Sequence, residues 1–178
     1  MGDEVKTRVA MWMKAKFDIK VYTVEEFKER VATRSVLLSK NIVLTDQSCP
    51  LCSLHQESPN HLFLRCKFSW SVWSQILDWW HFFWVCPSSI AGMASWWFDS
   101  SFRNLEKHIW EVCFYATIWS IWIMRNKLIF HSMTISSEEV VDLIKYRVAM
   151  WMKVKYEIKV YSIEEFKGFS DGIRLLKL

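Results

Sequence analysis

Three cysteines and one histidine occur in a spacing that can bind a metal ion. They are Cys49, Cys52, His61 and Cys66, and they form the pattern C-x2-C-x8-H-x4-C. Zinc in structural sites takes four thiolate or imidazole ligands in tetrahedral geometry. A C-x2-C turn offers two thiolates from one loop, and the x4 spacing suits a second pair on a helical turn. The pattern predicts a closed, structural Zn2+ site, because a catalytic site would keep one position open for water.

Other interpretations of these residues stay open. His55 lies between the two pairs and competes with His61 for the fourth position. The cluster can also be read as three buried cysteines beside an ordinary histidine. The remaining cysteines, Cys86 and Cys113, lie in aromatic runs and are interpreted as thiols of the hydrophobic core.

No catalytic motif accompanies the cysteines. The sequence contains no G-x-S-x-G, P-loop or G-x-G-x-x-G pattern. His108 and Glu111 are three positions apart, which is ordinary spacing on one helix face. Arg125 and Asn126 close an apolar helical stretch that begins at Ile109; we expect Arg125 to reach carbonyls or a carboxylate, and Asn126 to terminate or turn the helix. We therefore expect that this protein is not an enzyme.

Two segments resemble a known family. The run from Arg34 through Trp73 looks like the zinc-binding region at the carboxyl end of plant LINE-type reverse transcriptase proteins, and the segment WSIWIMRNKLIF is similar to one that follows it there. The resemblance spans about residues 30–165. The residues that carry it are Cys49, Pro50, Leu51, Cys52, Glu57, Ser58, His61, Leu62, Phe63, Cys66 and Trp73, then Trp119, Trp122, Arg125, Asn126, Ile129 and Phe130.

This resemblance implies a zinc region that assists nucleic-acid handling. The sequence departs from the family because it has no polymerase aspartate motif and no endonuclease or RNase H carboxylate set. The resemblance therefore implies a rearranged, retrotransposon-derived fragment in a plant gene, without reverse transcriptase activity.

The two ends of the chain repeat each other. Residues 6–29 and 145–168 align at an offset of 139, with 17 of 24 positions identical. In the second copy, Ser136 and Glu139 have capping-box spacing and open a helical pattern. The apolar face of that helix is expected at Val140, Ile144, Val148 and Trp151, with Lys155 on the same face. The alternating residues 156–160, like residues 17–21 of the first copy, predict a short strand. We expect either two surface arms or two copies that pair, within one chain or in a homodimer.

Composition favours a mainly α-helical domain. The 178 residues include 12 Trp but only 4 Gly and 3 Pro, which argues against turn-rich β folds and glycine-loop enzymes. We expect a helical domain with a small CCHC zinc knuckle and short strands in the two duplicated arms. The predicted divisions are an amino-terminal arm (1–33), a zinc-binding module (34–75), a Trp-rich helical region (76–135) and a carboxyl-terminal arm (136–178).

Charge and hydropathy bear on partners. Net charge is +3 over residues 1–40, 0 over residues 41–135 and +1 over residues 136–178. The aromatic centre thus lacks the basic face on which nucleic-acid binding usually depends. The pairs Trp79–Trp80 and Trp96–Trp97 are expected in a core or an interface rather than stacked on bases. We expect no membrane span and no signal peptide, and we therefore expect an intracellular location. The sequence does not distinguish the mitochondrion, the cytoplasm and the nucleus.

Two functions remain as hypotheses. The first is a non-enzymatic factor that acts through protein–protein interaction, with Trp-rich surfaces as anchors. Its partner would be another protein, such as an antidote or a mitochondrial protein, if the factor is a disruptive or cytotoxic one of the toxin–antidote type. The alternative is a nucleic-acid-binding zinc module that retains the ancestral retroelement role.

Overall fold

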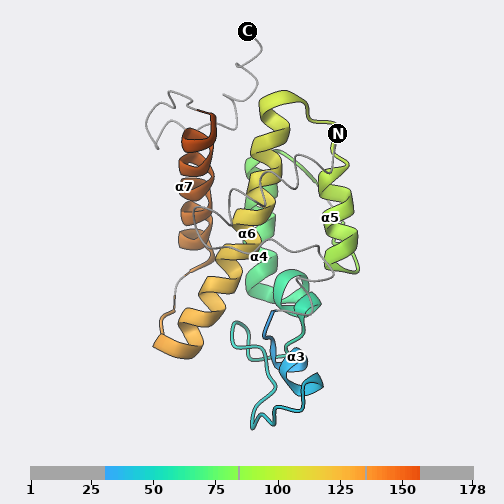
Figure 1. Cartoon of the computed structure of the whole chain (residues 1–178), viewed down its shortest axis with the longest axis vertical. Helices are drawn as coiled ribbons and strands as arrows, with labels where there is room; N and C mark the ends of the chain where they lie inside the picture. Colours follow the sequence, from blue (N-terminus) through green and yellow to red (C-terminus); the bar gives the residue numbers. More distant parts are fainter. Residues whose placement is uncertain (1–30, 84, 135, 157–178) are drawn as a thin grey trace.

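A computed structural model describes residues 31–83, 85–134 and 136–156, with side chains as far as Met152 (Figure 1). Its elements are α3 (Arg34–Ser39), the one-turn π-helix η1 (His61–Arg65), α4 (Lys67–Trp79), α5 (Ile90–Phe98), α6 (Asn104–His131) and α7 (Ser137–Tyr156). Within these ranges no strand is present, and the only β pairing is an isolated bridge between Ser48 and Gln56. The mainly α prediction is confirmed.

Helix α6 is the central element of the fold. Its apolar residues occur on all sides, so it is buried by neighbours rather than by one partner. In Figure 1, α7 and α5 lie on opposite sides of α6, α4 lies behind it, and the zinc-binding segment with α3 lies below. The core joins α4, α5, α6, α7 and the cysteine segment into one cluster of buried side chains.

Tryptophan side chains form the core between α5 and α6. The indoles of Trp97 and Trp110 stack with ring centroids 3.8 Å apart. Each indole Nε1 donates to the other residue's backbone carbonyl oxygen at 2.8 Å, so the polar edge of both rings is satisfied although both are buried. Trp73 packs edge-on against Trp97, with centroids 5.3 Å apart. These contacts confirm that Trp97 belongs to a core, whereas Trp96 is partly exposed.

Helix α7 begins at the predicted capping box. The Ser136 Oγ accepts from the Glu139 backbone N–H at 3.2 Å, and the Glu139 carboxylate accepts from the Ser136 N–H at 2.9 Å. The expected apolar face is buried at Val140, Ile144, Val148 and Trp151. Lys155 is helical, but its side chain is beyond those described.

The strand expected from Tyr156 and the helix end expected at Asn126 need correction. The strand expected from Tyr156 is wrong at that residue, because α7 continues through it; residues 157–160 and 17–21 lie outside the described residues. Asn126 does not end its helix, since α6 continues to His131 and stops at Ser132, whose φ of 50° is left-handed. Helix α4 runs across the predicted division at residue 75 without a break. Among the described residues, no helix is long and apolar enough to span a membrane.

Candidate metal centre

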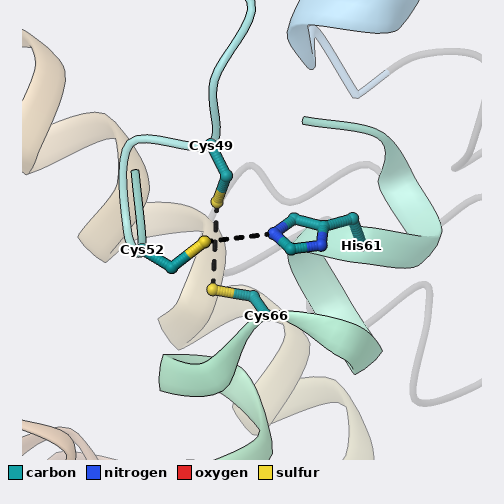
Figure 2. Close-up of side chains that lie close together, drawn as sticks. All are labelled: Cys49, Cys52, His61 and Cys66. Atoms are coloured by element: carbon teal, nitrogen blue, oxygen red, sulfur yellow. Dashed lines mark hydrogen bonds between the residues drawn. The ribbon is translucent and has the colours of Figure 1, made fainter. Parts of the chain in front are cut away.

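The structure brings the four predicted ligands together. One ligand atom from each of Cys49, Cys52, His61 and Cys66 lies within 4.8 Å of the other three. Cys49 Sγ is 3.8 Å from Cys66 Sγ, and Cys52 Sγ is 3.3 Å from His61 Nε2. Figure 2 shows the three sulfur atoms and the ring nitrogen pointing at one common point from the loop and from the helical turn.

These distances fit zinc. In a regular tetrahedron with Zn–S bonds of about 2.3 Å, two sulfur atoms are about 3.8 Å apart; with a Zn–N bond of about 2.0–2.1 Å, sulfur and nitrogen are about 3.6 Å apart. The observed 3.8 Å and 3.3 Å are close to both values. Three thiolates and one imidazole are a donor set of structural zinc sites. The site therefore fits Zn2+, which would cross-link two chain segments.

The first pair comes from a tight loop. The Ser53 N–H donates to the Cys49 carbonyl at 2.7 Å, and the Cys49 N–H donates to the His55 carbonyl at 2.7 Å. These bonds fold residues 49–55 back on themselves, so the side chains of Cys49 and Cys52 emerge on one side. Ser53 has φ of 54°, a left-handed conformation that the tight turn requires.

The second pair is placed by η1 rather than by an α-helical turn: His61 begins η1, and Cys66 directly follows it. The Cys66 N–H donates to the His61 carbonyl at 2.7 Å, five residues back, which widens the turn. His61 and Cys66 thereby face the same point (Figure 2). The Ser58 Oγ accepts from the His61 N–H at 3.1 Å and fixes the start of the turn. The x4 spacing in the sequence predicts a helical turn but carries no signal that it is a π turn.

A buried ion pair holds the cysteine loop on α6. Arg125 donates through Nε and Nη2 to the two carboxylate oxygens of Glu57, each at 2.9 Å. Both side chains are almost fully buried. Glu57 also accepts from the Arg34 N–H at 2.7 Å, and Arg125 Nη2 also donates to the Ala32 carbonyl at 3.2 Å. The expectation that Arg125 reaches a carboxylate and carbonyls is confirmed, while Glu57 as its partner was not predicted.

The other titratable candidates lie apart from the cluster. His55 is exposed and its ring centroid is 5.3 Å from that of His61, but it is not one of the four clustered ligands. Cys113 is fully buried, as expected of a core thiol, and burial raises its pKa to about 12. Cys86 is only half-buried and packs at the edge of the core.

The hydrogen bond between Cys49 and Cys66 shifts the pKa values of the two thiols in opposite directions. The Cys49 thiol donates to Cys66 Sγ, which lowers the pKa of Cys66 well below its usual range. The same hydrogen bond, together with burial, raises the pKa of Cys49. The thiolate is the form of cysteine that binds a cation.

Comparison with known proteins agrees with this site. Residues 2–73 match the family model described as zinc-binding in reverse transcriptase. The matched stretch contains all four clustered residues and ends at Trp73, the residue at which the first resembling run ends. It begins at residue 2, just before the amino-terminal copy of the repeat, and so includes that copy. No curated protein and no solved structure matches the chain.

The match and the cluster together define the class of site. Residues 2–73 are similar to the zinc-binding region of reverse transcriptases, and the cofactor of the site is zinc. The second resembling segment, around Trp119, Trp122, Arg125 and Asn126, lies beyond the matched stretch. It lies in α6 and meets the zinc region through the Glu57–Arg125 ion pair.

Proposed function

We propose that this protein is a non-catalytic, zinc-stabilised helical module that acts by binding another protein. The zinc supplies folding free energy by joining the loop at Cys49 to the turn at His61. All four ligand positions come from protein side chains, so the metal has no open position for water or substrate. The site therefore supports a structural role and no hydrolytic chemistry.

The observation that carries the proposal is the exposure of large apolar side chains on the zinc module. Val43 is 92% exposed and Leu54 is 70% exposed, and Ile42 of the same module is 46% exposed. Leu54 lies in the loop between Cys52 and His55, and so its position depends on the metal. Apolar side chains presented on a rigid support are the anchors that protein interfaces use.

The charges around the site support the same proposal. Arg125 is engaged with Glu57, and Arg34 forms an ion pair with Asp46. These two guanidinium groups are therefore not free to neutralise a phosphate, on which nucleic-acid affinity depends, whereas Arg65 and Lys67 on either side of Cys66 are exposed.

The experiment compares the wild-type chain with the double variant Val43→Ser, Leu54→Ser. Both are used as affinity baits in a cell lysate, with zinc content and helix content measured first to show that the variant folds. A partner that is captured by the wild type and lost by the double variant supports the proposal. A partner set that the double variant retains in full contradicts it.

A nucleic-acid-binding module is the second candidate, favoured by the match to a zinc-binding region of reverse transcriptase. A gel shift with RNA and with DNA at two salt concentrations tests it. Tight binding that weakens steeply with salt would favour this candidate and overturn the first, because such a slope measures phosphate contacts.

A further inference from the structure

The surface that α4 and α6 form together, termed the α4–α6 groove, is covered by the described part of the second copy of the repeat. Its first residues lie in α7, where the side chains of Val148, Ala149, Trp151 and Met152 are buried. Figure 1 shows α7 running alongside α6, and α7 contacts α4 as well. The described part of the second copy is therefore a helix whose apolar face is recognised by the groove.

Two polar contacts fix the register of this helix. Arg147 Nη1 donates to the Ser120 Oγ on α6. Lys145 Nζ lies over the Trp79 ring on α4, 5.2 Å from the ring centroid. One contact is made to each wall of the groove, so the helix is specified by charge as well as by shape.

Residues 6–13 carry the same set of groove-facing residues. The sequence KTRVAMWM at residues 6–13 aligns with KYRVAMWM at residues 145–152. The counterparts of Lys145 and Arg147 are Lys6 and Arg8, and the buried apolar residues recur as Val9, Ala10, Trp12 and Met13. The one difference, Thr7 for Tyr146, falls at a position where the side chain is 41% exposed.

We propose that residues 6–13 are a second ligand for the α4–α6 groove and compete there with residues 145–152 of the same chain. The groove thus has two competing ligands whose sequences differ at one of eight positions. The copy that does not occupy the groove keeps its apolar face, including its Trp side chain, outside the groove.

The connection is long enough for the competition to occur within one chain. Ala32 is anchored by Arg125, and the five residues from Arg125 to Ser120 rise about 7.5 Å along α6. Residues 14–30 span many times that distance when extended. A tethered segment also has an effective concentration of about millimolar, which favours the same chain over a second copy at ordinary concentrations.

The second copy has the advantage in the undisturbed chain, and this explains why it occupies the groove. Val140, Val141 and Ile144 are buried upstream of the repeat. Their counterparts at the same offset are Met1, Gly2 and Val5, which offer a less regular apolar face. The first copy should therefore take the groove when α7 is weakened.

The test uses the full-length, zinc-loaded chain with a photoreactive diazirine lysine analogue at position 6. Cross-links from position 6 to α4 residues near Trp79 are quantified by mass spectrometry, with the analogue at position 145 as the positive control. The change Trp151→Ala should raise the position-6 yield by about tenfold, because loss of a buried Trp weakens the competing copy by more than that factor. Adding Trp12→Ala should remove the gain.

Met152→Ala is a milder second variant if Trp151→Ala does not fold, as judged by circular dichroism. A yield from position 6 that stays unchanged in the weakened α7 variants would overturn the proposal. So would a gain that persists with Trp12→Ala. Mixing light and isotopically heavy chains before irradiation gives the last arm: cross-links within one chain are expected, and cross-links joining two chains would contradict competition within the chain.

Discussion

Glu57 and Arg125 are 68 positions apart and form a buried, bidentate ion pair with both N···O distances at 2.9 Å. Glu57 follows the C-x2-C loop, and Arg125 lies in the last third of α6. The pair therefore connects the zinc-binding loop to the central helix of the domain. Each of the two segments thus supplies one half of a buried charge pair.

Breaking this pair should cost a large part of the stability. We expect Arg125→Met to lower the free energy of unfolding by about 3–5 kcal/mol, because the Glu57 carboxylate is left buried without its partner. Denaturant unfolding of the zinc-loaded protein measures this. Asp46→Asn, which removes the more exposed ion pair with Arg34, serves as the control and should cost much less. Equal losses in the two variants would show that Arg125 has no special role.

Cysteine labelling should separate the five thiols into three groups. In the zinc-loaded protein, iodoacetamide should modify Cys86 slowly and leave Cys113 unmodified, because burial raises the pKa of Cys113 to about 12 and little thiolate forms. Addition of a strong chelator should make Cys49, Cys52 and Cys66 reactive. Mass spectrometry of the labelled peptides is the measurement. Labelling of Cys113 at the rate of Cys86 in the folded protein would disprove this assignment.

The left-handed residue in the cysteine loop predicts a stabilising substitution. Ser53 has φ of 54°, where a side chain costs about 1 kcal/mol or more and glycine is not penalised. Ser53→Gly should therefore raise the free energy of unfolding by about 0.5–1 kcal/mol, after the added freedom of the unfolded chain is counted. Ser53→Val should lower it. Equal denaturation midpoints for the Ser53→Gly and Ser53→Val variants would contradict a cost of the left-handed backbone at Ser53.

The capping box of α7 can be tested by a matched pair of variants. Ser136→Ala removes the acceptor for the Glu139 N–H and should cost about 1 kcal/mol. Glu139→Gln keeps an oxygen that can accept from the Ser136 N–H, so its effect should be smaller. Thermal unfolding followed by circular dichroism compares the two. A larger loss for Glu139→Gln would contradict the capping geometry.

Features set by near neighbours in the chain could be predicted from the sequence. Ser136 and Glu139 form the expected box because both partners lie within one turn of a helix. The cysteine and histidine spacing likewise places four ligands by local loop geometry, and the structure brings all four together.

Features set by long-range packing could not be predicted. Arg125 was expected to meet some carboxylate, but choosing Glu57 requires knowing that α6 passes under the cysteine loop. Asn126 was expected to terminate or turn the helix, yet α6 continues to His131 and ends at the left-handed Ser132, although no residue from 126 to 131 is buried. The π turn at His61–Arg65 was not predicted, because two residues five positions apart look the same in the sequence whether an α turn or a π turn joins them.

Metal analysis of purified chains tests the central claim most directly. The wild-type protein and His55→Ala should each carry about one zinc ion per chain, whereas Cys52→Ser and His61→Ala should lose most of it, because structural zinc needs all four ligands. Folding is checked in each variant by circular dichroism. A folded Cys52→Ser protein with the wild-type zinc content, or loss of zinc in His55→Ala alone, would contradict the site formed by Cys49, Cys52, His61 and Cys66.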